Sequence, residues 1–379
     1  MNPAITPFKV DIPQTQLDDL KARLANTRWP NPEPVDDWSQ GAPLGAVQSL
    51  CKYWEQSYDW RRCESELNKY PQFTTEIDGL DIHFLHIRSP HENAMPMIMT
   101  HGWPGSILEF IRVIEPLTNP TAHGGSADDA FHLVIPSLPG YGFSGKPTCT
   151  GWGLERIAKA WISLMERLEY SKYVAQGGDW GSGVTSAIGY IHPAECLAIH
   201  VNMALAQPSE EDMASLTERD QKALADLKYY FDSDAGYAII QKTRPQSLGY
   251  GLADSPAAQA AWIYEKFHRW TDNNGRPEDA LTIDQMLDDI SIYWLSNSGA
   301  SSARLYWESF DSIFAKPMTI PCGISIFPKE LFRPARKWAE CLYQNLIHWN
   351  ELDKGGHFAA FEQPELFVNE VRSCFSKIR

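Results

Sequence analysis

Hydrophobic positions along the chain follow two patterns that alternate with each other. Short apolar runs end in turns rich in glycine or proline, and longer stretches carry apolar residues three and four positions apart. The first pattern predicts strands and the second predicts amphipathic helices. Strands are expected over 97–99, 131–135, 173–175, 196–201, 318–326 and 346–349, and helices over 154–168, 184–190, 333–343 and 364–377. Such alternation predicts a mostly parallel sheet with helices on both faces and ligands at the carboxyl ends of its strands.

Two stretches interrupt this alternation. The N-terminal stretch is rich in Trp, Pro and charge, with helical spacing over 14–24 and 46–58 and a hairpin pattern over 74–87. The other stretch, between the two halves of the alternating pattern, has the spacing of helices and loops and is rich in Tyr and Trp. We therefore expect an N-terminal extension over 1–75 that packs on core and lid, core halves over 76–205 and 313–379, and an inserted helical lid over 206–312.

The most informative motif is Gln-Gly-Gly-Asp-Trp-Gly-Ser-Gly at residues 176–183. A strand, a tight glycine turn and a helix form a nucleophile elbow, which raises one side chain above the sheet edge. Gly177 and Gly181 leave room for the bend, and Asp179 stands where a Ser is usual. Alone the motif is weak, because a Gly-x-Asp-x-Gly string occurs by chance in roughly one chain in ten of this length.

An aspartate at an elbow suits a different reaction from a serine. A free aspartic acid has a pKa of about 3.9, so no base is needed to ionise it. A carboxylate can displace at saturated carbon and form an ester, which water then hydrolyses with the help of a base. The site therefore needs a histidine, an acid that orients it, and N–H donors for the oxyanion.

The sequence supplies each of these groups. His357 follows the last expected strand in Gly-Gly-His-Phe, and Glu330 follows the preceding strand in Phe-Pro-Lys-Glu. The other place for the acid, Asn-Met-Ala at 202–204, holds no carboxylate. Separately, Asp179 is also typical of a helix N-cap, Glu330 of a solvated loop acid and His357 of a surface histidine. Their order of nucleophile, acid and histidine, each at a strand end, favours a catalytic site.

The oxyanion donors are expected to be backbone amides. These are the amides of Trp103, in His-Gly-Trp-Pro, and of Trp180, directly after the elbow aspartate. His101 is interpreted as structural, because its turn contributes backbone groups. Ser182 follows the elbow instead of occupying it, which argues against a serine esterase.

With these motifs the chain resembles, over nearly its whole length, the microsomal-type epoxide hydrolases of the α/β-hydrolase superfamily. The matching stretches are 58–61, 70–73, 101–106, 136–141, 177–181, 254–256, 327–330 and 355–362. The resemblance implies an α/β-hydrolase fold and hydrolysis of a small-molecule epoxide to a vicinal diol through an Asp179 ester, without cofactor or metal. It also implies two lid tyrosines above the nucleophile, Tyr237 and Tyr306. A phenol of pKa near 10 can hydrogen-bond to the alkoxide of an opened epoxide and then protonate it.

Composition limits the partners and the cellular compartment that we expect for the protein. With 33 basic against 48 acidic residues, the net charge of −15 argues against nucleic acid or an anionic membrane as a partner. Seven scattered cysteines without a Cys-x-x-Cys pair favour free thiols in a reducing compartment. No run of 18 apolar residues and no signal peptide are present, so we expect a cytoplasmic protein without a membrane anchor. A homodimer is one assembly that the sequence allows.

Two alternative functions stay open at this stage. A haloalkane dehalogenase uses the same aspartate elbow and histidine, and the indoles of Trp103 and Trp180 offer N–H donors for a halide. Halide leaves without protonation, so two lid tyrosines would then be unnecessary. A small-molecule receptor on a hydrolase scaffold is the other alternative, and the complete set of Asp179, Glu330 and His357 argues against it.

Overall fold

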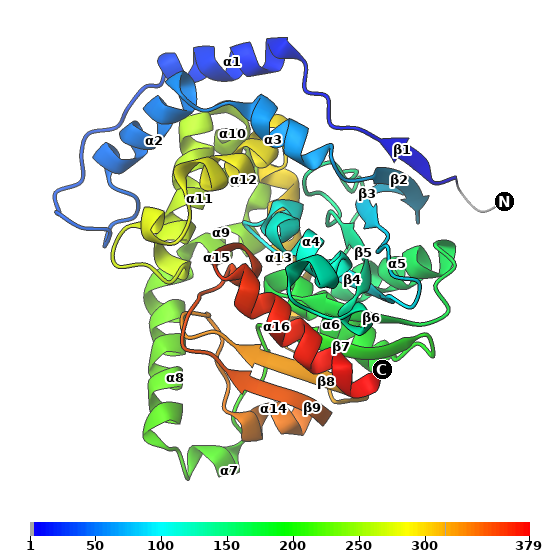
Figure 1. Cartoon of the computed structure of the whole chain (residues 1–379). Helices are drawn as coiled ribbons and strands as arrows, with labels where there is room; N and C mark the ends of the chain where they lie inside the picture. Colours follow the sequence, from blue (N-terminus) through cyan, green and yellow to red (C-terminus); the bar gives the residue numbers. More distant parts are fainter. Residues whose placement is uncertain (1–3, 315) are drawn as a thin grey trace.

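One sheet runs through the molecule and positions the rest of the chain (Figure 1). Its strands are β1 (Thr6–Phe8), β2 (Gln72–Ile77), β3 (Leu80–Ile87), β4 (Met95–Thr100), β5 (Phe131–Pro136), β6 (Tyr173–Gly177), β7 (Cys196–Val201), β8 (Met318–Ile326) and β9 (Tyr343–Glu351). The computed structural model describes residues 4–314 and 316–379, and within them the strand order is β1-β2-β3-β5-β4-β6-β7-β8-β9. The first three pairs in this order, β1–β2, β2–β3 and β3–β5, are antiparallel. The other five pairs, from β5–β4 to β8–β9, are parallel.

Helices cover both faces of the sheet and one of its ends. They are α1 (Gln14–Ala25), α2 (Leu44–Gln56), α3 (Trp60–Leu67), α4 (Ile111–Thr118), α5 (Leu154–Arg167), α6 (Asp179–Ile191), α7 (Glu210–Met213), α8 (Glu218–Tyr229), α9 (Gly236–Thr243), α10 (Pro245–Asp254), α11 (Pro256–Trp270), α12 (Ile283–Leu295), α13 (Gly299–Ser309), α14 (Arg336–Leu342), α15 (Ala359–Glu362) and α16 (Pro364–Phe375). A π-helical turn, η4 (Tyr230–Asp234), follows α8. Short 3-10 turns lie at η1 (Ile107–Phe110), η2 (Pro120–His123), η3 (Ala127–Asp129), η5 (Pro277–Asp279), η6 (Phe310–Ser312) and η7 (Ser376–Ile378).

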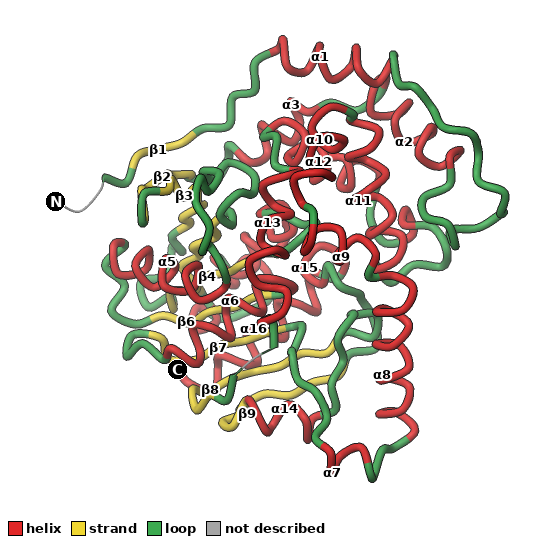
Figure 2. The backbone as a smooth tube through the Cα atoms, turned by 180° about the vertical axis from the view of Figure 1, so that it is seen from behind, coloured by secondary structure: helices red, strands yellow, loops and turns green. Residues whose placement is uncertain are grey.

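The two faces of the sheet are covered by different helix pairs. Ile199 of β7 lies against α6, whereas the next residue, His200, faces α16, because successive strand residues point to opposite faces. α4 packs with α16 on one face, and α5 packs with α6 on the other. α16 crosses the front of the sheet in Figure 1, and α5 and α6 lie nearer the viewer from behind in Figure 2. This arrangement confirms the mostly parallel, doubly covered sheet predicted from the alternating pattern.

The strands and long helices lie close to their predicted positions, with one informative exception. The helix after the elbow was expected from Val184, but α6 begins at Asp179. Gly181 and Gly183 in its first two turns carry no apolar side chain, so the hydrophobic rhythm starts only after them. The early start matters because it makes the elbow aspartate the first residue of a helix.

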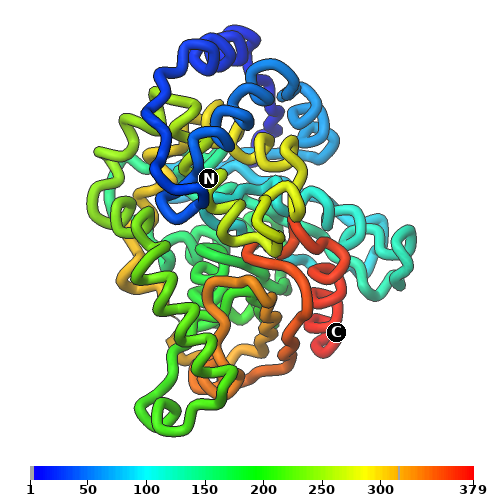
Figure 3. Tube along the Cα trace, turned by 90° about the vertical axis from the view of Figure 1, so that its left-hand side faces the viewer, coloured from blue at the N-terminus to red at the C-terminus, as the bar shows by residue number. Residues whose placement is uncertain are grey.

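The N-terminal segment spans the molecule from the sheet edge to the helices between β7 and β8. β1 pairs with β2, and α1 and α2 pack on α11 (Figures 1 and 3). The Tyr58 hydroxyl donates to Asp288 at 2.7 Å, Arg62 pairs with Asp288 at 2.5 Å, and the Trp54 indole donates to Ser291 at 3.0 Å. These contacts tie the segment directly to α12. All seven cysteines are free, as the scattered pattern predicts.

The segment between β7 and β8, from α7 to α13, lies toward the end of the sheet where the parallel strands terminate (Figure 1). α8 extends down the side of the molecule, while α9 to α13 pack on one another. Within residues 4–314 and 316–379, every helix is too short or too polar to cross a lipid bilayer.

Candidate active site

The sharp turn between β6 and α6 raises the Asp179 side chain above the sheet. Asp179 has a φ of 49°, in the left-handed region that residues with a Cβ rarely adopt. The N-cap position of α6 belongs to Gly178 and not to Asp179. A Cβ on Gly181 would lie 1.9 Å from the carbonyl oxygen of Thr100, so only glycine permits this approach of helix to strand. The backbone therefore presents the carboxylate and does not use it as a helix cap.

Both oxygens of this carboxylate have partners from other strand ends. The backbone N–H of Trp103, after β4, donates to Asp179 Oδ1 at 2.7 Å. His357 Nε2, after β9, lies 3.3 Å from Asp179 Oδ2. A Cβ on Gly102 would lie 2.1 Å from Oδ1, so a glycine is required there to admit the carboxylate. The nucleophile candidate is thus held between an amide and an imidazole.

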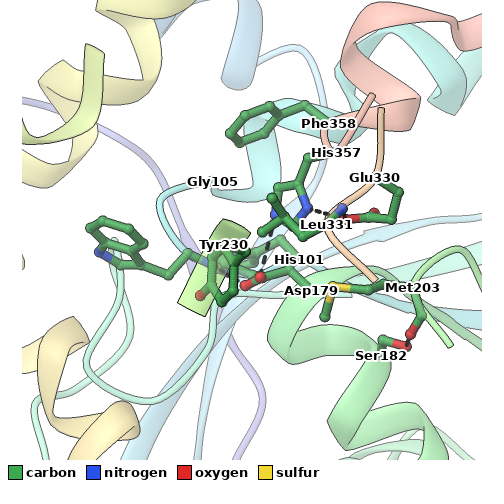
Figure 4. A network of polar contacts seen from close by, with 12 residues as sticks. His101, Gly105, Asp179, Ser182, Met203, Tyr230, Glu330, Leu331, His357 and Phe358 are labelled. Atoms are coloured by element: carbon green, nitrogen blue, oxygen red, sulfur yellow. Dashed lines mark hydrogen bonds and ion pairs between the residues drawn. The ribbon is translucent and has the colours of Figure 1, made fainter. Parts of the chain in front are cut away.

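His357 is held by Glu330 on its other nitrogen (Figure 4). The distance from His357 Nδ1 to Glu330 Oε1 is 2.6 Å, and both side chains are buried. A parallel bridge between Lys329 and Gly356 continues the β8–β9 pairing past the strand ends. Because each side chain follows directly on that bridge, the loop of the acid and the loop of the histidine lie side by side.

The two carboxylates determine the charge state of the imidazole. Burial by itself disfavours a charged His357, but the negative charges of Glu330 and Asp179 and their hydrogen bonds outweigh burial and raise the pKa of His357 well above its usual value. A protonated imidazole cannot accept a proton from water. Loss of the negative charge on Asp179 would remove part of this effect and make His357 a better base.

One of the two expected oxyanion donors contacts the carboxylate. The Trp103 amide does so, whereas the Trp180 amide makes no hydrogen bond to it in the described part of the chain. As the second residue of α6, Trp180 has no acceptor within the helix for its N–H, so this donor stays available. His101 lies close by, but its Nε2 accepts from the Leu138 amide at 3.2 Å, in agreement with a structural role.

The loop that carries Trp103 is anchored from α12. Ser106 donates to Asp289 Oδ1 at 2.6 Å, and the Tyr293 hydroxyl donates to the Gly105 carbonyl at 2.8 Å. Burial raises the pKa of Asp289 to about 8, although the Ser106 hydrogen bond opposes this shift. The His-Gly-Trp-Pro-Gly-Ser motif is therefore held at Trp103 by Asp179 and at Gly105 and Ser106 by α12.

The two predicted tyrosines lie together over the nucleophile. The Tyr237 ring stacks on Trp103 with centroids 4.9 Å apart, and the Tyr306 ring meets Trp180 edge-on at 4.7 Å. The Tyr237 and Tyr306 ring centroids are 5.8 Å apart. With Asp179 they line a cavity of about 170 Å³, whose other walls include Phe231, Phe310, Phe314 and Phe332. Burial raises the pKa of both phenols well above the usual value, so both are neutral donors.

A third tyrosine in the site was not predicted. The Tyr230 hydroxyl lies 2.8 Å from the Tyr237 hydroxyl, and its ring lines the same cavity. It belongs to the π-helical turn η4, an irregular element that is common at functional sites. Tyr230 also lines a larger polar cleft on the side of Glu330, so it separates the two spaces. No regular spacing in the sequence distinguishes this tyrosine from its neighbour Tyr229.

A half-buried glutamate near the nucleophile was also missed. Glu109 lines a void of about 10 Å³ together with Asp179, His357 and Trp103. That volume is close to what one water molecule requires. Burial, reinforced by the negative charge of Asp289, raises the pKa of Glu109 well above its usual value. The only sequence signal is its position three residues after the Ser106 of the conspicuous loop motif.

The described residues contain no group of three or more His, Cys, Asp or Glu side chains arranged to bind a metal ion. The groups that the site brings together are a carboxylate, an imidazole with its acid partner, backbone N–H donors and phenols.

Two protein families match this chain. One is described as "Epoxide hydrolase N terminus" and matches residues 5–110, and the other is described as "alpha/beta hydrolase fold" and matches residues 95–247. A Stigmatella aurantiaca protein, named as a candidate epoxide hydrolase, is 57% identical, covering 99% of this chain and 86% of its own length. Epoxide hydrolase 1 of Sus scrofa is 34% identical over 97% of this chain and 88% of its own.

Solved structures give the same picture. The epoxide hydrolase of Aspergillus niger superposes with a TM-score of 0.89 at 33% identity, covering 99% of this chain and 97% of its own. The juvenile hormone epoxide hydrolase of the silkworm Bombyx mori superposes with a TM-score of 0.91 at 31% identity, covering 99% and 95%. These matches confirm the fold that the motifs led us to expect.

Proposed function

The chain belongs to the epoxide hydrolase family of the α/β-hydrolase superfamily, and from this membership we propose that it opens epoxides to vicinal diols through a covalent ester on Asp179. One observation carries the proposal. The Asp179 carboxylate lies between the Trp103 amide and the His357 imidazole and borders a cavity that contains two buried phenols. Epoxide opening needs a nucleophile on one side of the substrate and proton donors on the other.

The first step is ester formation. Tyr237 and Tyr306 hold the epoxide oxygen, and an Asp179 oxygen attacks a ring carbon from the opposite side. A C–O bond to Asp179 forms while the ring C–O bond breaks, and a phenol proton passes to the resulting alkoxide. The neutral state of both buried phenols supports this role, because only a protonated phenol can donate. The aromatic walls of the cavity suit an apolar substituent on the epoxide.

The second step is hydrolysis of the ester. Esterification removes the charge of Asp179, so the His357 pKa falls, the imidazolium releases its proton to solvent, and the neutral imidazole can act as a base. Glu330 keeps it oriented through Nδ1. We place the attacking water in the small void lined by Asp179, His357 and Glu109. Water passes a proton to His357 and attacks the ester carbonyl carbon, and the N–H groups of Trp103 and Trp180 stabilise the oxyanion of the tetrahedral intermediate. The bond from that carbon to the substrate oxygen then breaks, and the diol leaves with the proton from His357.

The helical segment over 206–312 acts in this proposal as a lid, and the N-terminal extension over 1–75 holds it in place. Tyr237 on α9 and Tyr306 on α13 belong to the lid, whereas Asp179 and His357 belong to the core. The hydrogen bonds from Tyr58 and Trp54 to α12 support the second role. A dehalogenase would need no phenol proton donors, and a receptor would need neither these donors nor a base.

Trapping the ester tests the proposal. His357→Gln removes the base but leaves the nucleophile, so mixing it with styrene oxide should add the mass of one substrate to the intact protein. Asp179→Asn should form no adduct and lose diol formation by several orders of magnitude. In a single turnover in ¹⁸O-labelled water, the label should enter Asp179 and not the diol. If His357→Gln is inactive and forms no adduct, or if the label enters the diol, the covalent mechanism is wrong and water attacks the epoxide directly.

A further inference from the structure

A buried lysine lies beside the site and has no role in the steps above. Lys266, on α11, is only 2% exposed, and its one ion-pair partner among the described residues is Glu265 at 2.8 Å. Its Nζ lies 4.4 Å from the centre of the Tyr237 ring and 5.7 Å from that of Trp270. Lysine is rarely buried without compensation for its charge. The aromatic faces supply part of that compensation, because a ring face attracts a cation.

The ammonium affects the two states of Tyr237 differently. A neutral phenol ring attracts it through the quadrupole of the ring, which is a modest interaction. When the phenol loses its proton, a full negative charge spreads over the oxygen and the ring, and the attraction to a cation at this distance becomes much stronger. An interaction that strengthens as charge develops lowers the barrier of the step instead of binding both states equally.

Among the residues that the structure describes, no lysine or arginine lies over the ring of the second lid phenol. Within the described residues, the rings packed around Tyr306 are aromatic and uncharged: Trp103, Trp180, Tyr237 and Phe310. Tyr237 also has a hydroxyl partner in Tyr230 at 2.8 Å, which can return a proton to it. The two phenols are therefore chemically different although both face the nucleophile.

We propose that Lys266 is a positioning residue that makes Tyr237, and not Tyr306, the proton donor to the opened epoxide. The inference rests on the proposed function and assigns different roles to its two phenols. As the bond from Asp179 to carbon forms and the ring C–O bond breaks, the Tyr237 proton moves to the former ring oxygen. The phenolate remains beside the ammonium until Tyr230, which borders the polar cleft, hands on a proton from solvent. Tyr306 contributes a hydrogen bond to the same oxygen.

The pH dependence of ester formation follows from the charges around these groups. Burial lowers the pKa of Lys266, and the negative charge of Glu265 opposes that shift. The other charged groups that face Lys266 are Asp234 and Arg269, and those that face Tyr237 are Tyr230, Tyr306 and Asp179. Ester formation should slow at alkaline pH as the ammonium loses its proton. In Lys266→Met, which lacks the ammonium, the fall in the rate of ester formation at alkaline pH should begin at a higher pH.

The test measures the rate of ester formation with styrene oxide by rapid quenching and intact mass, in the His357→Gln background. Lys266→Met should slow adduct formation about tenfold or more at pH 7. Lys266→Arg keeps a cation and should recover most of the rate. In a Tyr237→Phe background, Lys266→Met should have no further effect, whereas in Tyr306→Phe it should keep its full effect. The matched control is Lys316→Met, which removes an exposed ammonium 4.7 Å from the Tyr190 ring and should change nothing.

Two results would overturn the inference. One is an unchanged rate of adduct formation in Lys266→Met, and the other is an equal loss of rate in the Tyr237→Phe and Tyr306→Phe backgrounds, which would indicate a general packing defect. A total absence of adduct from His357→Gln itself would instead refute the covalent mechanism. In that case the rate of diol formation would be measured instead, in enzymes with an intact His357. The effect of Lys266→Met would again be compared between the Tyr237→Phe and Tyr306→Phe backgrounds.

Discussion

At the scale of single residues, the site depends on where Asp179 sits in its turn. Its left-handed backbone costs about 1–3 kcal/mol, which the surrounding glycine contacts and strand ends must offset. In return, one oxygen faces an amide and the other faces an imidazole. In the proposed mechanism, the carboxylate that attacks the substrate also keeps His357 protonated beforehand, so formation of the ester and activation of the base become one linked event.

This linkage predicts a specific pH dependence for the hydrolytic step. Glu330 and Asp179 both raise the pKa of His357, and only Glu330 keeps its charge once the ester has formed. The decay of the ester should slow below the pKa of His357 in that state, because a protonated imidazole cannot accept a proton. Glu330→Gln removes the remaining charge, so this acid limb should move to lower pH, while the plateau rate falls through loss of orientation.

Ester decay after rapid mixing, followed between pH 5 and 9, measures both effects. Glu351→Gln, which removes a partly exposed carboxylate at the end of β9, is the control and should leave the acid limb in place. An acid limb that stays at the same pH in Glu330→Gln would contradict the assignment of Glu330 as the partner of His357.

Strand-end residues were predictable because parallel strands bring their carboxyl ends together wherever those strands occur in the sequence. This rule placed Asp179, Glu330 and His357 near one another before any coordinates. Tyr237 and Tyr306 came only from the family resemblance, since nothing in helical spacing separates them from packing tyrosines. Lys266 had a signal that was not used: it lies three residues after Ile263 and four before Trp270, on the buried stripe of α11.

At the scale of elements, the N-terminal segment is bound to α12 by a small polar cluster. Asp288 accepts from the Tyr58 hydroxyl and pairs with Arg62, and it lies 230 and 226 positions after these two residues in the sequence. Composition indicated that this segment packs against another surface, because it is too aromatic for a linker. The expectation that it packs on core and lid could not name α12, since a contact between residues more than 200 positions apart leaves no local pattern.

Breaking this cluster should reduce stability more than activity. Asp288→Ala leaves the Tyr58 hydroxyl buried without an acceptor and removes the partner of Arg62, which should cost about 1–3 kcal/mol. Calorimetry should show a lower Tm, while kcat/KM at 25 °C stays near the wild-type value as long as the protein is folded. Asp19→Ala breaks an exposed pair with Arg23 and should cost no more than about 0.5 kcal/mol. Equal Tm values for the two variants would show that the cluster does not hold the segment.

At the scale of the whole molecule, the sheet and α16 share one buried acid. Glu370 accepts from Ser325 and pairs with His348, both at 2.7 Å, and accepts from Asn350 at the same distance. Burial by itself would raise the pKa of Glu370, but these three partners outweigh it and lower that pKa to about 2. The carboxylate therefore stabilises the fold in its charged form.

The sign of this shift sets the pH range in which the fold loses stability. A folded-state pKa below the usual value of 4.5 gives stability that is complete above pH 4.5 and is lost as the pH falls toward 2. Glu370→Gln should lower the free energy of unfolding in urea at pH 7 and make it depend less on pH between 4.5 and 3. Glu365→Gln, on an exposed position of α16, should keep the wild-type slope. A wild-type slope in Glu370→Gln would contradict the role of this network.

The docking of α2 on α11 has a consequence during translation. α2 ends at Gln56 and α11 begins at Pro256, so the ribosome must add about 200 further residues before the apolar face of α2 has its partner. At about 5–20 residues per second, the part of this face that α11 will cover lacks that partner for about 10–40 seconds. The nascent N-terminus is then a target for chaperones, and a burst of synthesis without them should send the chain into inclusion bodies.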